Sequence, residues 1–522
     1  MSRPGEPLGG GFSGAIRGSV NGVMSEATAG PAELRETHIS LVVVFGDRVY
    51  KLKKPVRLDF VDLSTREARE RICHREVELN RRIAPDVYLG VADVVGPDGS
   101  VCDHLVVMRR MPDDRRLSTL VRSRAAVDDH LRQIARVVAS FHSRAETSAE
   151  VADSSRPHAI RAKWEATFRT VQPHVGFILA ADVEERIRGL ARRYLDGRAA
   201  LFDQRIAEGK VLDGHGDLLA DDIFCLDDGP RILDCVEFDD ELRRGDVLAD
   251  VCFLSMDLER LGAPDLGASF LSWYRELSAE TYPLTLAHHY VAFRAHIRAM
   301  VACLRAAQGD DVAADDAAGL LEIARNHLER GRVALVLVGG LPGTGKSTLA
   351  AGLADRFGWS VLRSDEVRKD LAGVAHTERA DADFREGLYR PEATVATYRA
   401  LLERARRLLE LGEPVVLDAS WTDRRHRAAA EAMARETSSE LVELQCTAPP
   451  EVASERLRER ARGVGDVSDA TPAVAAAMAA TSDPWPRAES IDTTTPAGIT
   501  LARSEVVVRE RLERTGDTGL TS

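Results

Sequence analysis

The sequence predicts a multidomain protein, with an α+β domain at residues 33–326 and an α/β domain built on a parallel sheet at residues 333–512. A chain of 522 residues is too long for a single hydrophobic core, so two or three domains are expected. In the first domain, strand patterns come first and helix patterns follow, whereas strand and helix patterns alternate in the second domain. A polar stretch at residues 325–332 separates these patterns and places the boundary.

The composition and charge are those of an ordinary globular protein. Hydrophobic residues make up 44% of the chain and charged residues 29%. The sequence contains no run of about 18 apolar residues, so no membrane span is expected. The net charge of −13 disfavours a general binder of nucleic acid or membrane surfaces, which are themselves polyanionic. Seven scattered cysteines without a C-x-x-C pair predict buried thiols and a cytoplasmic protein. The segments 1–32 and 513–522 are predicted to be disordered.

The first domain is predicted to begin with a β-hairpin. Residues 39–44 and 48–53 have strand composition, and Gly46-Asp47 makes the turn between them. Residues 65–82 carry apolar side chains at helical spacing, and residues 101–108 form another strand. The hairpin, the helix and the later strand therefore form the first part of the domain.

The rest of the first domain is predicted to be mostly helical. Residues 109–112 connect it to the preceding strands, and helical patterns cover residues 125–209 and 247–331. Short strands near Leu212, Ile223 and Ile232 lie between these helical stretches. Strands with one helix, a connector and a helix-rich half are the element order of a two-lobed protein kinase.

The second domain is predicted to be a parallel α/β sheet. Residues 333–338 are fully apolar and run into a glycine-rich loop, and a helix follows at residues 348–357. Further strands are expected at residues 360–362, 415–417 and 441–444. Apolar strands that alternate with helices indicate a sheet covered by helices on both faces.

The glycine-rich loop has the spacing G-x4-G-K-S between a buried strand and a helix, which is what a phosphate-binding P-loop requires. Its glycines let backbone N–H groups surround phosphate oxygens. Lys346 would place its charge on the β- and γ-phosphates as a catalytic residue, and Ser347 would reach Mg²⁺. We therefore expect ATP and Mg²⁺ here, bound by Gly340, Leu341, Pro342, Gly343, Thr344, Gly345, Lys346, Ser347 and Thr348.

Polar residues elsewhere in the second domain are further candidates. Asp365 and Arg368 follow a strand, and Asp365 would accept a proton from an attacking hydroxyl or act as a helix-start residue. Asp418 ends an apolar strand and would orient the Mg²⁺ water shell or cap the strand end. Arg456 and Arg460 share a helix face and would clamp the transferred phosphate, unless that face is simply solvated.

These motifs resemble the small-molecule and polynucleotide kinase branch of the P-loop proteins, which includes gluconate kinases, zeta toxins and polynucleotide 5′-kinases. The resemblance covers about residues 333–510. It implies phosphorylation of a hydroxyl without saying which one. It is carried by residues 340–348, 364–368 and 415–420, Arg456-x3-Arg460 and Ser468-Asp469-Ala470.

A second group of acidic residues lies in the first domain. Asp217 belongs to a His215-Gly216-Asp217 motif after a short strand, and Asp222 and Asp234 flank the next hairpin. Three carboxylates at one end of a hairpin repel one another unless a cation screens them. We therefore predict a Mg²⁺–nucleotide site, with Asp217 as the base for a substrate hydroxyl and Asp222 and Asp234 as metal ligands. The alternative is that all three are surface turn residues.

This pattern resembles the catalytic and metal motifs of aminoglycoside phosphotransferases and their choline, fructosamine and maltose kinase relatives. Asp222 departs from the pattern, because that position is usually Asn, and it adds a negative charge. The resemblance implies a lysine on a return strand that reaches the nucleotide phosphates and pairs with a helical glutamate. Lys51 is the preferred lysine, Lys53 is the alternative, and Glu76 is the partner.

From about residue 33 to 510 the chain is similar to bacterial bifunctional proteins that combine an aminoglycoside-phosphotransferase-like domain with an ATP-binding P-loop domain. Four motifs carry this likeness, namely Tyr50-Lys51-Leu52-Lys53-Lys54-Pro55, residues 79–90, Glu237-Phe238-Asp239 and Asp418-Ala419-Ser420-Trp421. It implies a two-kinase enzyme that transfers the γ-phosphoryl of ATP to the hydroxyl of a small molecule, such as a sugar or polyol.

Two alternatives to this function stay open. In one, the first domain is a non-catalytic sensor that regulates the P-loop domain, and Asp222 is the feature that favours it. In the other, the protein is a nucleic-acid 5′-kinase. The acidic net charge and the lack of a basic, aromatic-rich stretch disfavour that activity. The sequence indicates no protein partner.

Overall fold

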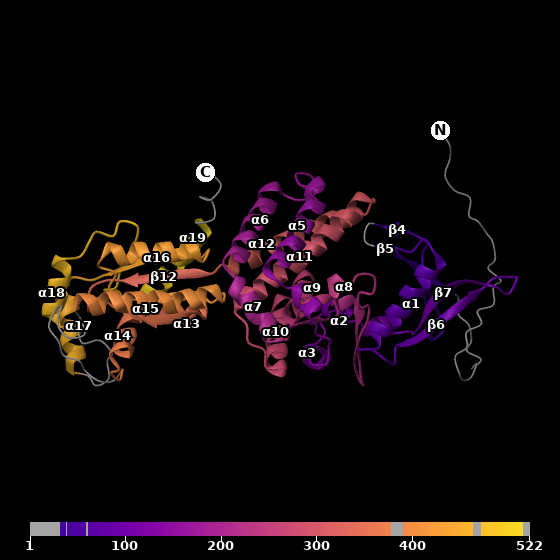
Figure 1. Cartoon of the computed structure of the whole chain (residues 1–522), viewed down its shortest axis with the longest axis horizontal. Helices are drawn as coiled ribbons and strands as arrows, with labels where there is room; N and C mark the ends of the chain where they lie inside the picture. The colour runs from indigo at the N-terminus through magenta and orange to yellow at the C-terminus, as the bar shows by residue number, and fades with distance from the viewer. Residues whose placement is uncertain (1–31, 38, 59–60, 377–389, 463–470, 515–522) are drawn as a thin grey trace. The chain divides into compact units, whose positions relative to one another are not determined.

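The computed structural model describes residues 32–37, 39–58, 61–376, 390–462 and 471–514 (Figure 1). The chain divides into two compact units, Met1–Ser155 with Gly209–Glu280 and Arg156–Glu208 with Thr281–Ser522. Of the termini predicted to be disordered, residues 1–31 and 515–522 lie outside the described residues. In the described part of the chain, no helix combines the length and apolar character needed to cross a bilayer.

The first unit contains a five-stranded antiparallel sheet with the order β1-β2-β3-β7-β6. Helix α1 packs on one face, where Cys73 and Val77 meet Val106 and Met108 of β7. Its first turn is capped by Thr65, whose hydroxyl accepts the Ala68 N–H. The elements are β1 (Glu33–Glu36), β2 (Ser40–Phe45), β3 (Arg48–Lys53), β4 (Arg57–Leu58), β5 (Val61–Asp62), α1 (Arg66–Asn80), β6 (Tyr88–Val95) and β7 (Val101–Arg109).

The predicted antiparallel sheet and helical lobe are confirmed, with β1 and β6 as strands that the sequence did not predict. The β2–β3 hairpin, α1 and β7 lie where their patterns placed them. Strand β6 is irregular, because its pairing with β7 shifts register between Tyr88 and Gly90. Strand β1 is exposed along its whole length and has no apolar alternation. Neither strand therefore has a regular period-2 pattern.

Short strands and helices complete the first unit. The three predicted short strands are β8, β9 and β10. Strands β9 and β10 form an antiparallel pair, and β8 pairs with β11, which the sequence did not predict. The elements are η1 (Asp113–Arg115), α2 (Leu117–Arg122), α3 (Asp128–His142), α4 (Ala149–Asp153), β8 (Val211–Asp213), η3 (Ala220–Asp222), β9 (Ile223–Leu226), β10 (Gly229–Ile232), α8 (Asp240–Arg243), β11 (Arg244–Asp246), α9 (Val247–Arg260) and α10 (Pro264–Ser278).

The second unit combines five helices and a 3-10 turn with the P-loop domain. Buried contacts join them: Arg198 donates to the Thr437 carbonyl at 2.7 Å, and Thr285 Oγ1 donates to the Gly412 carbonyl at 2.6 Å. The helical elements are α5 (Pro157–Val171), η2 (Gln172–His174), α6 (Ala181–Asp196), α7 (Ala199–Ala207), α11 (Leu284–Ala307) and α12 (Asp311–Arg330). The helices on both sides of residues 209–280 thus belong to the same compact unit as the P-loop domain.

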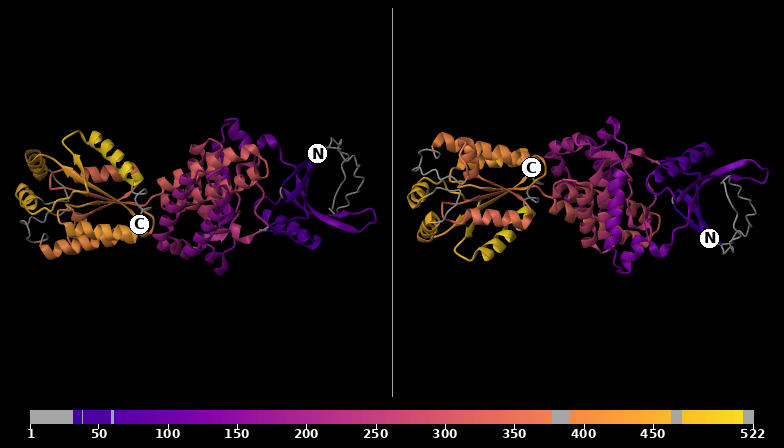
Figure 2. Two further views of the ribbon diagram at one scale, coloured as in Figure 1. Left: turned by 90° about the horizontal axis from the view of Figure 1, so that it is seen from above. Right: turned by 90° about the horizontal axis from the view of Figure 1, so that it is seen from below.

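The P-loop domain is a five-stranded parallel sheet with the order β13-β14-β12-β15-β16, and helices cover both faces (Figure 2), as predicted. All six residues of the central strand β12 are buried, which explains its uninterrupted apolar sequence. The elements are β12 (Ala334–Gly339), α13 (Lys346–Phe357), β13 (Ser360–Arg363), α14 (Ser364–Ala372), α15 (Pro391–Glu410), β14 (Val415–Asp418), α16 (Arg424–Glu436), β15 (Glu440–Thr447), α17 (Pro450–Arg462), α18 (Pro472–Ala480), β16 (Glu489–Asp492) and α19 (Ala497–Arg514).

Candidate functional sites

Lys51 on β3 and Glu76 on α1 form an ion pair in the first unit. The Lys51 Nζ lies 2.9 Å from Glu76 Oε1 and 2.8 Å from Asp234 Oδ1. Burial alone would lower the pKa of Lys51, but the carboxylates of Asp234 and Glu76 raise it well above its ordinary value. Lys51 is therefore a fixed cation between helix α1 and the segment that follows β10.

Lys53, the alternative lysine, lies deeper. Its Nζ is 2.7 Å from Glu76 Oε2 and 2.5 Å from Glu237 Oε1, and its side chain is fully buried. The side chain of Lys51 keeps 14% of its surface exposed. Lys53 is thus enclosed by protein carboxylates, whereas Lys51 stays accessible beside Asp234. The two lysines share Glu76, and this geometry favours Lys51 as the residue that reaches a ligand.

The three predicted acids Asp217, Asp222 and Asp234 lie close enough to influence one another. Burial of the Asp222 carboxyl, together with the charges of Asp234 and Asp217, raises the pKa of Asp222 well above its ordinary value. Burial opposes the ionisation of Asp234 too, but Lys51 holds its pKa below the ordinary value. One carboxyl of the group is therefore favoured in its neutral form, while its neighbour stays ionised.

These carboxylates suit a Mg²⁺ ion that arrives with phosphates. Carboxylate oxygens are the ligands that Mg²⁺ prefers, and the ion usually takes one or two of them together with substrate phosphates and water. Among the residues that the structure describes, no three His, Cys, Asp or Glu side chains are grouped so as to hold a metal by themselves. The residues present therefore fit a metal–nucleotide complex better than a free metal ion.

The loop that carries Asp217 is fixed by a buried acid that the sequence did not reveal. Asp250 on α9 accepts the N–H groups of His215 at 2.7 Å and Gly216 at 2.9 Å, and its Oδ2 lies 3.1 Å from His142 Nε2. Burial opposes its ionisation, but the hydrogen bond and charge of His142 hold the pKa of Asp250 far below its ordinary value. The signal in the sequence was an aspartate inside the otherwise apolar start of α9, because a buried acid needs partners.

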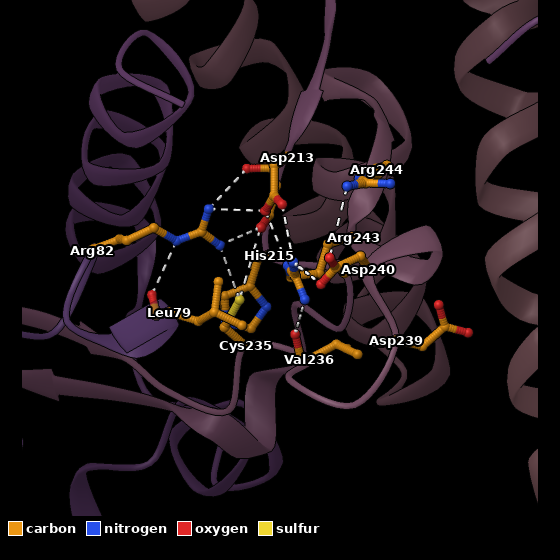
Figure 3. A network of polar contacts seen from close by, with 12 residues as sticks. Leu79, Arg82, Asp213, His215, Cys235, Val236, Asp239, Asp240, Arg243 and Arg244 are labelled. Atoms are coloured by element: carbon orange, nitrogen blue, oxygen red, sulfur yellow. Dashed lines mark hydrogen bonds and ion pairs between the residues drawn. The ribbon is translucent and has the colours of Figure 1, made fainter. Parts of the chain in front are cut away.

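A second buried acid, Asp213, lies between two arginines directly before the loop (Figure 3). Arg82 Nη1 donates to Asp213 Oδ1 at 2.9 Å, and Arg243 donates to both carboxylate oxygens at 3.0 Å. Burial opposes its ionisation, but the hydrogen bonds from Arg243 lower the pKa of Asp213. The sequence did not identify Asp213 or Arg243 as site residues, because their partners are distant along the chain.

The P-loop has the backbone that its glycines predict. Gly340, Gly343 and Gly345 all have positive φ angles, of 140°, 82° and 80°. A Cβ atom on Gly343 would lie 2.5 Å from the Ala453 carbonyl oxygen of α17, so only glycine fits there. Helix α13 begins at Lys346, which places Ser347 and Thr348 in its first turn. The N–H groups of this turn point at the loop and suit phosphate oxygens.

Asp418 lies beside the P-loop, because β14 pairs in parallel with β12. Its side chain is only 4% exposed, and its Oδ2 lies 3.3 Å from Arg363 Nε. The Oδ1 atom is buried and has no hydrogen-bond partner in the described part of the chain. A buried carboxylate oxygen without a partner is costly, and a hydrated Mg²⁺ ion would satisfy it.

Asp365 and Arg368 lie on one face of α14, where Arg368 Nη1 is 2.8 Å from Asp365 Oδ1. The buried residue Tyr398, which the sequence did not indicate, lies nearby, and burial raises its pKa, with smaller opposing effects from Arg368 and Asp365. Its hydroxyl is 3.1 Å from Ser420 Oγ and accepts the Trp421 N–H at 3.0 Å. An acid, a cation and two hydroxyls therefore gather beyond the ends of β13 and β14.

The predicted lid residues are only partly described. Arg456 Nη2 donates to the Thr493 carbonyl at 2.7 Å, and its Nη1 lies 3.4 Å from the carbonyl of Gly343 in the P-loop. Arg456 is therefore placed against the phosphate loop and does not belong to a purely solvated face. The side chain of Arg460 and the motif at residues 468–470 lie outside the described residues.

Comparison with known proteins identifies the relatives of this chain. Residues 335–485 match the family model of an AAA domain. The chain is 44% identical to uncharacterized proteins of Mycobacterium tuberculosis and Mycobacterium bovis over 466 residues, which cover 89% of this chain and 93% of each relative.

Solved structures give weaker likenesses. A choline/ethanolamine kinase family protein from Mesorhizobium loti has a TM-score of 0.36 and 15% identity, over 57% of this chain and 91% of that chain. A gluconokinase from Sinorhizobium meliloti has a TM-score of 0.25 and 17% identity, over 36% of this chain and 94% of that chain. On sequence identity and coverage, the chain belongs to the same family as the two mycobacterial proteins.

Proposed function

We propose that the protein is an ATP-dependent phosphotransferase with two nucleotide sites, each of which transfers the γ-phosphoryl group of ATP to a hydroxyl of a small molecule such as a sugar or polyol. The observation that carries the proposal is the junction of Lys51, Glu76 and Asp234 beside the Asp217 loop. A separate phosphate loop with Asp418 next to it supports a second site.

In the first site, Lys51 would contact the α- and β-phosphates while Glu76 keeps it in place. Asp222 and Asp234 would hold Mg²⁺, which neutralises charge that develops on the phosphates. Asp217 would accept the proton of the attacking hydroxyl. Asp250 would support this role by fixing the backbone that precedes Asp217, because it accepts the N–H groups of His215 and Gly216.

In the second site, the backbone of residues 340–348 would surround the phosphates, and Lys346 would reach the β- and γ-phosphates. Ser347 and Asp418 would orient the hydrated Mg²⁺. Asp365 would accept the proton of the hydroxyl acceptor, with Arg368 beside it. Arg456 and Arg460 would stabilise the charge of the transferred group.

The experiment is an ADP-release screen on the full chain against sugars, polyols, aminoglycosides, nucleosides and a 5′-hydroxyl oligonucleotide. Lys346→Ala should remove one activity and Asp217→Asn another, typically by about 10²–10⁴-fold for a general base. If Lys346→Ala removes all activity and Asp217→Asn none, the first unit is a regulatory domain instead. Turnover with the oligonucleotide alone would indicate a nucleic-acid 5′-kinase.

The regulatory alternative has one observation in its favour. Asp222 stands where kinases with this pattern usually have Asn, and the raised pKa of its buried carboxyl reflects crowding by Asp234 and Asp217. A domain that binds nucleotide without turning it over would tolerate such crowding. Asp222→Asn separates the two functions, because it should raise turnover only in a catalytic site.

A further inference from the structure

Residues at the end of α1 and in the segment after it contact both the loop that carries Asp217 and the segment that carries Asp234. The sequence motif at residues 79–90 contains Asn80, Arg82 and Tyr88, which the proposed chemistry does not use. Asn80 is fully buried, donates to the Glu76 carbonyl at 2.9 Å and accepts the Cys235 N–H at 2.9 Å. Its amide therefore joins the helix that carries Glu76 to the residue after Asp234.

Tyr88 holds Asp234 from the other side. The buried Tyr88 hydroxyl accepts the Asp234 N–H at 3.1 Å and lies 3.5 Å from Asp234 Oδ1. Asp234 has a φ of +63°, a left-handed conformation that is uncommon for residues other than glycine, although aspartate adopts it more often than most. Hydrogen bonds at its own N–H and at the N–H of Cys235 fix this backbone, and the Asp234 carboxylate lies 2.8 Å from Lys51.

Arg82 joins residues 79–90 to the start of the loop that carries Asp217 (Figure 3). Its Nη1 donates to Asp213, and its Nη2 donates to the Gly214 carbonyl at 2.8 Å and lies 3.3 Å from Cys235 Sγ. Gly214 precedes His215 in the Asp217 loop, and Cys235 follows Asp234. One guanidinium group therefore contacts the backbone before the proposed base and the side chain next to the proposed metal ligand.

We propose that Asn80, Arg82 and Tyr88 are positioning residues that set the Asp217 loop and the Asp234 segment relative to each other. The inference rests on the proposed function of the first site. The segment links Glu76, the metal-ligand backbone and the base loop in one hydrogen-bonded chain, so a shift of any part moves the phosphate contacts. It also gives a physical role to the motif at residues 79–90, which no catalytic contact explains.

The test uses the full chain with Lys346→Ala, so that nucleotide binding reports the first unit. Tyr88→Phe removes one oxygen and keeps the buried ring, and Arg82→Lys keeps the charge without the fork that reaches two groups. Arg66→Lys is the matched control, because Arg66 in the first turn of α1 donates to the Val101 carbonyl and to Glu67, and none of these partners belongs to the segment or to either loop. Calorimetry measures the ATP dissociation constant over a range of Mg²⁺ concentrations, and thermal unfolding is measured in parallel.

We expect Tyr88→Phe and Arg82→Lys to weaken Mg²⁺-dependent ATP binding by about tenfold, because each loses a buried hydrogen bond that aligns the site. The midpoint in Mg²⁺ should rise while binding in EDTA and the melting temperature change little. Arg66→Lys should behave like its parent. Unchanged binding in folded variants, or equal losses in Arg66→Lys, would overturn the positioning role. If the Lys346→Ala parent itself binds no Mg²⁺–ATP, that result contradicts the proposed function of the first site, and with it the positioning role that rests on it.

Discussion

Asp250 shows how a single buried carboxylate organises a site that it does not enter. It accepts two backbone N–H groups of the Asp217 loop and contacts His142, so the charge is shared by several donors. His142 is itself held by the Tyr274 hydroxyl at 2.8 Å. A charged group in this position is stable only while every donor stays in place. Asp250 therefore determines the conformation of residues 214–217.

Asp250→Asn should destabilise the first unit by about 3 kcal/mol, because an amide cannot accept every hydrogen bond that the carboxylate accepts. The folded pKa of Asp250 is depressed, so its stabilisation is present above the unfolded pKa of about 3.9 and is lost as the pH falls further. Urea unfolding of wild type and variant should therefore differ most at neutral pH and converge below about pH 4. A difference that does not change with pH would contradict this role.

The three acids of the first site lead to a prediction about metal removal. Asp217 and Asp234 both act on the carboxyl of Asp222, and in the proposed site these acids would repel an anionic triphosphate, so ATP should bind in the Lys346→Ala chain only with a divalent cation. Asp234→Ala should weaken this binding. Asp217→Asn should leave it nearly intact and remove phosphoryl transfer by about 10²–10⁴-fold. Calorimetry with Mg²⁺ and with EDTA measures both effects, and equal binding in EDTA would contradict the metal site.

At the scale of elements, regular patterns were predictable and distant pairings were not. The hairpin β2–β3, helix α1 and the fully apolar β12 were identified because their spacing is visible within a few residues. Lys51 and Glu76 were placed by resemblance, and the structure brings them within 2.9 Å. Arg82 and its partner Asp213 are separated by 131 residues, so no local spacing reveals their contact. Single-sequence patterns also do not identify which domain a helix packs against.

The P-loop and helix α17 form a contact that a matched pair of glycines can test. Gly343 and Gly358 both have positive φ angles, so alanine is strained at either position. A Cβ on Gly343 would clash with the Ala453 carbonyl, whereas no atom of the described residues lies within 4 Å of one on Gly358. Gly343→Ala should therefore weaken ATP binding at the P-loop at least about tenfold, and Gly358→Ala should cost only stability. Equal ATP dissociation constants for the two variants would show that α17 does not shape the loop.

At the scale of the whole molecule, the helices α5–α7, α11 and α12 and the P-loop sheet form one compact unit. Glu440, at the start of β15, is 2% exposed and lies 2.9 Å from Arg332 and from Arg193. The backbones also meet closely, because a Cβ on Gly197 would overlap the Thr437 carbonyl. The boundary expected at residues 326–332 stays a prediction, and a cut before Arg332 would separate Glu440 from Arg193.

Glu440→Gln tests whether this junction stabilises the P-loop domain. The variant leaves Arg332, whose side chain is 4% exposed, without its closest carboxylate, and one Glu440 oxygen is buried without a hydrogen-bond partner among the described residues. We expect the second unit to lose about 3 kcal/mol, since the buried charge of Arg332 then keeps only the longer contact with Glu329, at 3.3 Å. Glu436→Gln is the control, because it removes the same charge four residues earlier from an exposed pair with Arg406 and should change much less. Urea unfolding followed by Trp421 and Trp485 fluorescence, both in the P-loop domain, measures the difference. Equal losses in the two variants would mean that the ion pairs of Glu440 do not stabilise the P-loop domain.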